Sequence, residues 1–211
     1  MKYMYGLLIL VMVMAPLFAE TTVNKSIHIR SDERRSDGCN TVNGSITLDD
    51  GVRVSGGCKS VNGSIRIGDD CVVRRVSTVN GAIRLGRDNT VGSDIESVNG
   101  SISCQTGTIV DDGIETVNGS IEIDGTTVED DITTYNGSIS LSNRSEVGDN
   151  IIVKRNRGHN NRRKPLYITI DRSTVHGDVI NYEDDIEVIV ILRDGGEVRG
   201  DIVNAIVKRE R

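Results

Sequence analysis

The charged side chains that could bind a partner are concentrated in one short segment of the chain. Residues 154–164 carry six positive charges and no acid, namely Lys154, Arg155, Arg157, Arg162, Arg163 and Lys164. Acids outnumber bases over the rest of the chain. A cationic region on an acidic protein favours binding to an anionic polymer or surface, such as lipopolysaccharide phosphate, teichoic acid, acidic polysaccharide or anionic lipid. The alternative is a solvated insertion that docks on an acidic flank of its own chain or of a neighbouring copy.

A sequence repeat determines where the other chemically useful side chains lie. The tract VNGSI, with small variations, occurs six times, and a degenerate copy begins at Val23-Asn24. The intervals between successive asparagines are 19, 19, 18, 19, 19 and 18 residues. The six repeated asparagines are Asn43, Asn62, Asn80, Asn99, Asn118 and Asn136. A fixed period of this kind is typical of a solenoid in which each repeat forms one coil.

The spacing of aliphatic residues inside each period indicates the shape of the coil. They recur about every six residues, as in Val61, Ile67 and Val73, and a second apolar residue often follows four positions later. An amphipathic helix would need a period of 3.6 residues, which is absent. The pattern therefore predicts an all-β, single-stranded parallel β-solenoid, or β-helix, with three short sides per coil. The valine of each VNG tract is expected among the inward residues.

The aliphatic frame continues after the VNG tract is lost, so the solenoid is expected to continue too. Ile168, Ile170, Val175 and Val179 match positions in the coils before and after them. About nine coils of 18–19 residues follow, which corresponds to a rod of ~43 Å. The interval from Leu141 to Ile170 is 29 residues, so some ten residues must leave the solenoid as a loop. The basic segment, 154–165, is the expected insertion.

The Asn-Gly pair of each repeat is expected to form one corner of the coil. Asparagine and glycine adopt left-handed backbone angles more readily than other residues do, and tight bends often require those angles. Coils that stack ~4.8 Å apart would place the six asparagines above one another. Their side-chain amides could then form a hydrogen-bonded ladder with a structural role.

The repeated VNGSI-type tracts resemble those of the bacterial exported adhesin-type domains, a β-solenoid family of largely unassigned function. The likeness is strong over residues 23–153 and weaker beyond them. In coil length the chain is also similar to the bactofilin polymer-forming solenoids, although those lack a signal peptide. The resemblance implies a solenoid in the periplasm or at the cell surface, and it supplies no catalytic residues.

The amino terminus has the features of a secretory signal peptide. Lys2 precedes an uncharged apolar run, Leu7 to Phe18, that ends in Ala19. This run of 12 residues is shorter than the roughly 20 that a membrane-spanning helix needs. We therefore expect residues 1–19 to be removed and residues 20–211 to form an exported domain with no transmembrane span. Its net charge would be −7, or −13 without the six cations of the basic segment.

Two of the four cysteines occupy equivalent positions in consecutive coils. Stacking would bring the Cα atoms of Cys39 and Cys58 to ~4.8 Å, which is within the range that a disulfide accepts. Export supplies an oxidising compartment, so a bond between them is one interpretation and a pair of buried thiols is the other. Cys71 and Cys104 lie on different sides of the solenoid, two coils apart, which excludes a bond between them.

The histidines and acids do not predict a metal centre or cofactor. His28 lies in the first coil, about 30 Å from His159 and His176, so the three cannot share one zinc ion. Acidic pairs at the corners could offer oxygen ligands to calcium, although solvated corners explain them equally well. These pairs are Asp49-Asp50, Asp69-Asp70, Asp111-Asp112 and Asp130-Asp131.

The sequence favours a non-catalytic protein, since no nucleophile, base and orienting group recur together. We expect an exported cell-envelope scaffold or adhesin-like interaction protein, which is a monomer or an end-to-end dimer. One alternative is a carbohydrate-binding or carbohydrate-active solenoid, which would need two carboxylates at a set distance, one with a raised pKa, in a groove. Another is a self-assembling solenoid. Nucleic acid is not expected as a partner, because the basic segment contains no aromatic residue for base stacking.

Overall fold

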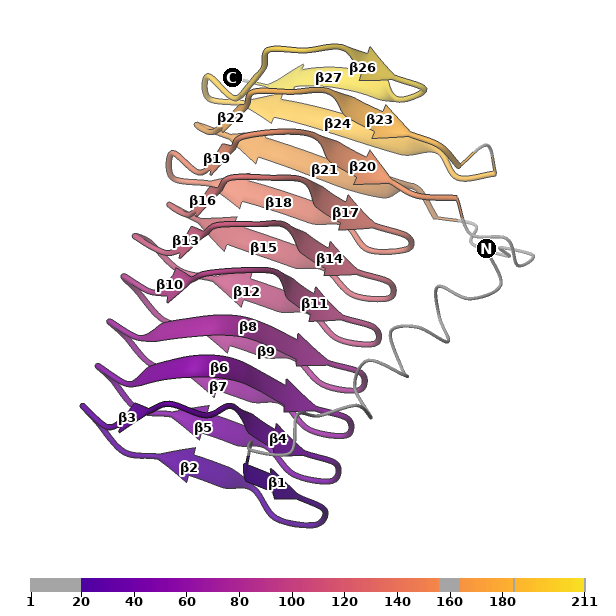
Figure 1. The fold of residues 1–211 in the computed structure, drawn as a ribbon. Coiled ribbons are helices and arrows are strands. Elements are labelled where there is room, and N and C mark those ends of the chain that lie inside the picture. Colours follow the sequence, from indigo (N-terminus) through magenta and orange to yellow (C-terminus); the bar gives the residue numbers. More distant parts are fainter. Residues whose placement is uncertain (1–19, 156–163, 184, 211) are drawn as a thin grey trace.

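Over the residues described in the computed structural model, twenty-seven parallel strands stack into one β-solenoid of about nine turns. The structure describes residues 20–155, 164–183 and 185–210. The expected signal peptide, residues 1–19, lies outside them. The coils rise in sequence order from β1 to β27 (Figure 1). Within the described part of the chain, no helix has the length and apolar character to cross a membrane. The predicted all-β solenoid is confirmed.

Each coil has three sides, which we call faces 1, 2 and 3 in the order in which the chain meets them. Face 1 is a ten-stranded sheet made of β2 (Ile27–Ile29), β5 (Ile46–Leu48), β7 (Ile65–Ile67), β9 (Ile83–Leu85), β12 (Ile102–Cys104), β15 (Ile121–Asp124), β18 (Ile139–Ser142), β21 (Leu166–Asp171), β24 (Val188–Arg193) and β27 (Ile206–Glu210). Faces 2 and 3 belong to a continuous 17-stranded sheet.

Short strands form most of face 2, and slightly longer ones form face 3. Face 2 contains β3 (Arg34–Arg35), β10 (Thr90–Val91), β13 (Ile109–Val110), β16 (Thr127–Val128), β19 (Glu146–Val147), β22 (Thr174–Val175) and β25 (Glu197–Val198). Face 3 contains β1 (Glu20–Thr22), β4 (Cys39–Thr41), β11 (Ile95–Ser97), β14 (Ile114–Thr116), β17 (Ile132–Thr134), β20 (Ile151–Val153), β23 (Val179–Asn181) and β26 (Ile202–Val203). The long strands β6 (Arg53–Ser60) and β8 (Val72–Thr78) pass through both faces.

The core is a column of stacked aliphatic side chains that follows from the alternation within each strand. On face 1 two inward residues flank one outward residue, as Ile65 and Ile67 flank Arg66. Face 2 contributes one inward valine per coil from Val54 onward, with Arg35 at this position in the first coil, and face 3 contributes an isoleucine, valine or cysteine. Parallel pairing places like residues over like, for example Ile102 over Ile83 and Ile121 over Ile102. Every inward position is therefore covered by the same position of the next coil.

The valine of the VNG tract does not belong to this core, contrary to the expectation from its spacing. Its exposed fraction ranges from 36% at Val42 to 9% at Val117, because it lies in the turn after face 3 rather than in a strand. The inward residue at the end of face 3 is instead the serine or threonine just before it. Thr116, which is fully buried, donates a hydrogen bond from Oγ1 to the Gly100 carbonyl oxygen of the preceding coil at 3.2 Å. The equivalent hydroxyls of Thr41, Ser60, Thr78 and Ser97 make the same kind of bond.

The glycine of the VNG tract is needed for a close approach of backbones, and the prediction of left-handed angles at this corner was wrong. Among the described residues, positive φ occurs mainly at the turn from face 1 to face 2, for example at Asp70 (57°) and Gly107 (80°). No VNG asparagine or glycine of the described chain has such an angle. A Cβ atom on Gly119 would lie 2.9 Å from the backbone nitrogen of Ser101 and closer still to the Gly100 carbonyl.

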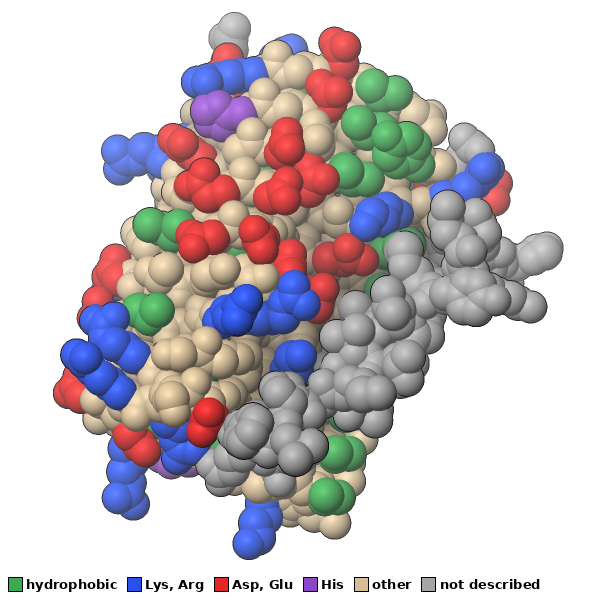
Figure 2. Space-filling model, in the orientation of Figure 1, with side chains coloured by type: hydrophobic (Ala, Val, Ile, Leu, Met, Phe, Trp, Pro, Cys, Tyr) green, Lys and Arg blue, Asp and Glu red, His purple; other side chains and the backbone are tan. Residues whose placement is uncertain are grey.

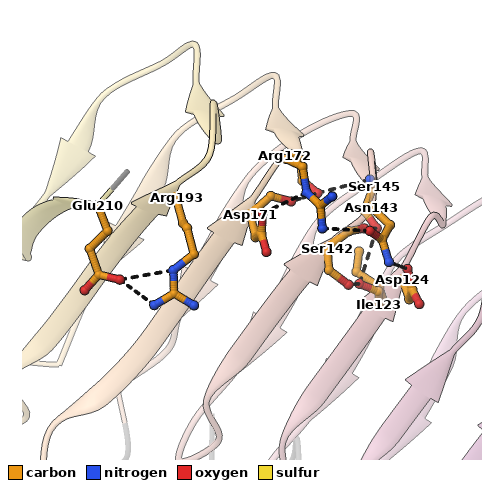
Figure 3. Close-up of polar contacts among 10 residues, drawn as sticks. Ile123, Asp124, Ser142, Asn143, Ser145, Asp171, Arg172, Arg193 and Glu210 are labelled. Carbon is orange, nitrogen blue, oxygen red and sulfur yellow. Dashed lines mark hydrogen bonds and ion pairs between the residues drawn. The ribbon is translucent and has the colours of Figure 1, made fainter.

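The turn from face 1 to face 2 is held by polar contacts between successive coils (Figure 3). Arg172 donates to Asn143 Oδ1 at 3.0 Å and to Asp171 Oδ1 at 3.1 Å, and Asn143 donates in turn to Asp124. In the last coils Arg193 pairs with Glu210. These contacts satisfy polar groups at the turn and link successive coils there.

Candidate binding surface

The basic segment leaves the solenoid at the turn from face 3 to face 1. Leu141 pairs with Ile170 and Ile151 pairs with Val179, so the extra residues lie between β20 and β21. Lys154 and Arg155 follow β20 directly, and Lys164 precedes β21. The other three predicted binding residues, Arg157, Arg162 and Arg163, lie outside the described residues.

Lys154 is anchored on the surface of face 3. Its Nζ atom lies 3.1 Å from Glu115 Oε2 and 5.9 Å from the centroid of the Tyr135 ring. About a third of each charged side chain is exposed (34% and 38%), so the ion pair contributes at most about 1 kcal/mol to stability. These contacts fix the first cation of the basic segment in position, while its charge is partly balanced by Glu115.

A second, shorter insertion at the same turn was not predicted. Residues 182–187 connect β23 to β24, where the earlier coils have a VNG corner. Asn181 organises this turn, since its Nδ2 atom donates to the carbonyl oxygens of Ile186 (3.3 Å) and Asn204 (3.0 Å). The sequence signal for it was the interval of 22 residues between Ile170 and Leu192, which exceeds the usual period.

The repeated asparagines form the expected ladder along the same edge of the solenoid. Each Nδ2 atom donates to the Oδ1 atom of the preceding asparagine at 2.8–2.9 Å, from Asn43, which donates to Asn24, through Asn62, Asn80, Asn99 and Asn118 to Asn136. The amides are thus used in bonding between coils. This arrangement supports a structural role and not a ligand site.

The four cysteines are buried thiols in the structure. Cys39 in β4 and Cys58 in β6 are register partners. A hydrogen bond between the Cys58 and Cys39 thiols, followed by burial, raises the pKa of Cys58 well above its ordinary value. Burial alone raises the pKa of Cys104 to about 12. None of these environments generates a reactive thiolate, which would require a lowered pKa.

The described histidines lie in separate surface contacts. His28 Nε2 is 2.9 Å from Asp49 Oδ1 in the first coils. His176, near the other end, lies 3.7 Å from Glu146 and 2.9 Å from an Arg199 nitrogen. His159 lies outside the described residues. His28 and His176 therefore do not share a site in the structure.

Among the described residues, one cluster of three aspartates has the spacing of a possible cation site. Ligand oxygens of Asp130, Asp131 and Asp149 lie within 4.8 Å of one another. Asp131 Oδ1 already accepts hydrogen bonds from the backbone nitrogen and side-chain amide of Asn150, at 2.9 and 3.0 Å. The bonds give this carboxylate a structural function at the corner, as expected for solvated acidic turns.

A row of charged side chains crosses the middle of face 3. Glu96 and Glu115 are register partners in adjacent strands, and Arg75 pairs with Asp94 beside them. Partial burial, with smaller contributions from Asp94 and Glu115, raises the pKa of Glu96, although Arg75 opposes the shift. The pocket of about 340 Å³ lined by Arg34–Gly38 lies three coils away, or ~14 Å along the axis. Glu96 thus has a raised pKa, but it does not lie in that pocket.

Comparison with known proteins adds no family to this picture. No family profile, curated protein or solved structure matches the chain.

Proposed function

We propose that this chain is a non-catalytic, exported scaffold of the cell envelope, which attaches to anionic envelope material through its basic segment. The observation that carries the proposal is the position of the six cations. They form an insertion that the solenoid does not require, because the coils before and after it pair in register without it. The remainder of the mature chain is acidic, so the insertion is the part suited to an anionic partner.

Export is an essential part of this proposal and rests on the amino-terminal sequence. The run from Leu7 to Phe18 and the following Ala19 have the features of a cleaved leader. An adhesin-like role agrees with a rigid rod that presents one distinctive surface. The acidic flanks of the rod would discourage adhesion elsewhere on an anionic envelope.

Co-sedimentation with envelope fractions tests the proposal. The full chain is expressed with its own leader, purified after export and checked by mass spectrometry at its amino terminus. It is then mixed with outer membrane or with peptidoglycan, at low and high salt. We expect it to pellet with at least one fraction at low salt, and a variant with all six cations changed to glutamine to stay in the supernatant.

Two controls make this result specific. A sample without envelope material separates binding from self-assembly, because a self-assembling solenoid pellets alone. A second variant with six exposed arginines elsewhere changed to glutamine carries the same net charge. Equal binding by the two variants would contradict a role for the basic segment.

A carbohydrate-active role is the second candidate, and the Glu96–Glu115 pair favours it. Adjacent strands place the two carboxylates as neighbours, and the pKa of Glu96 is raised. A general acid in a glycosidase needs such a shift. A glycan array followed by hydrolysis assays tests this role, and activity that is lost on Glu96→Gln would favour it over the scaffold.

A further inference from the structure

The last three coils carry apolar residues at outward positions that are polar in the earlier coils. On face 3 the stacked outward residues are Lys59, Ser77, Glu96, Glu115 and Thr133, and the column then continues as Ile152, Ile180 and Val203. On face 1 the residue before the inward isoleucine is serine or alanine in the first seven coils, and the stacked column then continues as Tyr167, the buried Ile189 and the exposed Ile206. The fold does not require these apolar residues, since the earlier coils form without them.

These two columns flank the same turn and form one surface. Tyr182 lies in the turn between them and is 55% exposed, and the side-chain bonds of Asn181 join the turn to Asn204, which lies between Val203 and Ile206. Figure 2 shows hydrophobic side chains gathered over β23 and β26, with basic side chains nearby. We call this surface the apolar corner and define it by Ile152, Ile180, Val203, Tyr182, Tyr167 and Ile206.

The charges around the apolar corner are mixed, with basic residues in excess. Lys154, Arg155 and Lys164 lie at the same turn, where the basic segment leaves and re-enters the solenoid. Glu183, Asp185 and Glu187 belong to the shorter insertion one coil further on. Glu183 is buried, with 2% of its surface exposed, and therefore adds little to the outer charge. In the sequence, the six cations of the basic segment outnumber the four acids of the shorter insertion, which are Glu183, Asp184, Asp185 and Glu187.

An apolar surface that includes two tyrosines and has cations beside it has the composition of a membrane-binding surface. Aliphatic side chains enter the acyl boundary, tyrosine prefers the headgroup level, and lysine and arginine pair with anionic headgroups. A soluble polysaccharide or teichoic acid would use the cations and would leave the aliphatic residues without a partner. A two-fold pairing of two copies at this corner would bring the cations of one copy against those of the other.

We propose that the apolar corner docks on an anionic lipid bilayer, with the cations beside it contacting the headgroups. This inference rests on the proposed function and narrows its anionic partner to a lipid surface. The isoleucines and valine provide the apolar contact, and their position on a rigid stack of strands keeps the contact surface formed in the unbound protein.

A single tryptophan provides a direct probe of the contact, because the chain contains none. The variant Tyr182→Trp is mixed with vesicles of phosphatidylglycerol and phosphatidylethanolamine, some containing brominated acyl chains. We expect its fluorescence to shift to the blue and to be quenched by the brominated lipid. Ile109→Trp is the matched control, since Ile109 is 43% exposed but lies on face 2. We expect no quenching of that variant.

Vesicle co-flotation of unlabelled variants measures the contribution of the apolar residues. Tyr182→Ser/Val203→Ser removes two exposed apolar side chains from the corner, and we expect the partition coefficient to fall about tenfold or more. Val23→Ser/Ile109→Ser removes two equally exposed side chains elsewhere and should leave binding unchanged. Circular dichroism of each variant verifies that the solenoid is still folded.

The outcomes separate this inference from the proposed function. Quenching confined to Tyr182→Trp, together with loss of binding in the corner variant alone, supports docking on lipid. Salt-sensitive pelleting with envelope polymers without any quenching overturns the lipid inference and leaves the proposed function standing. A blue shift of Tyr182→Trp that depends on protein concentration in the absence of vesicles identifies a second copy as the occupant and also overturns it. No binding to any envelope fraction contradicts both.

Discussion

Cys39 and Cys58 are register partners in the parallel strands β4 and β6, and the hydrogen bond between their thiols raises the pKa of Cys58. Both side chains are fully buried. Neighbouring parallel strands place their Cα atoms ~4.8 Å apart, within the range of disulfides. The two thiols are therefore positioned to be joined when an oxidant reaches them.

We predict that the chain contains this disulfide after the export that we propose, because an oxidising compartment supplies the oxidant. Alkylation of the denatured, non-reduced protein should modify Cys71 and Cys104 only, and mass spectrometry of its peptides should find Cys39 linked to Cys58. The bond would close a loop of about 20 residues, so reduction should lower the free energy of unfolding by about 3 kcal/mol. Modification of all four cysteines before reduction is the result that contradicts the bond.

Cys104 provides a prediction about stability at alkaline pH. Burial raises its pKa from 9.0 to about 12, so in the folded protein the thiol stays protonated where the unfolded chain would ionise it. The stabilising effect of this protonated thiol is complete below pH 9 and is lost as the pH rises from 9 towards 12, by roughly 1 kcal/mol per pH unit. Urea unfolding at pH 8 and at pH 10.5 measures the loss. Cys104→Val should lose less stability between these two pH values, and equal losses would show that Cys104 does not contribute.

The sequence predicted the solenoid well because its information is periodic. The coil length, the parallel stacking and the asparagine ladder all follow from residues that recur every 18 or 19 positions. Equivalent residues of successive coils stack on one another, which allows only one strand register. Leu141 and Ile170 are such equivalent residues, so the long interval between them located the insertion from the sequence alone. The number of times the aliphatic pattern repeats also gave the number of coils.

The details at the corner could not be read from the same pattern. Val61 has the spacing of an inward residue but lies in the turn, and the buried hydroxyl of Ser60 takes the inward place because it can bond to the Gly44 carbonyl. The VNG tract needs glycine because the backbone of the neighbouring coil leaves no room for a Cβ atom, and not because of the glycine's own backbone angles. The apolar corner was also missed, because the relevant residues come from different coils and become neighbours only through register.

Glu96 should be a site at which loss of charge stabilises the protein. Partial burial raises its pKa, so the ionised carboxylate at pH 7 costs stability that protonation restores as the pH falls. We predict that Glu96→Gln raises the melting temperature at pH 7 by about 2 °C or less. The difference from the wild type should disappear at low pH, where Glu96 is protonated in both folded and unfolded chains. Glu122→Gln, at an exposed position of face 1, is the control and should show no such pH-dependent gain.

Because the coils approach closely at the VNG corner, a substitution there can test why glycine recurs. A Cβ atom on Gly119 would lie 2.9 Å from Ser101 N and closer to the Gly100 carbonyl, both backbone atoms that cannot rotate away. Gly119→Ala must therefore separate two coils locally, and we predict a loss of about 2–4 kcal/mol in the free energy of unfolding. Gly92→Ala is the matched control, because its nearest neighbour outside the adjacent residues would be Asp111 Oδ2 at 3.7 Å, an ordinary contact. Denaturant unfolding of both variants measures the difference, and equal stability would mean that the corner can open without cost and that the coils are not held together there.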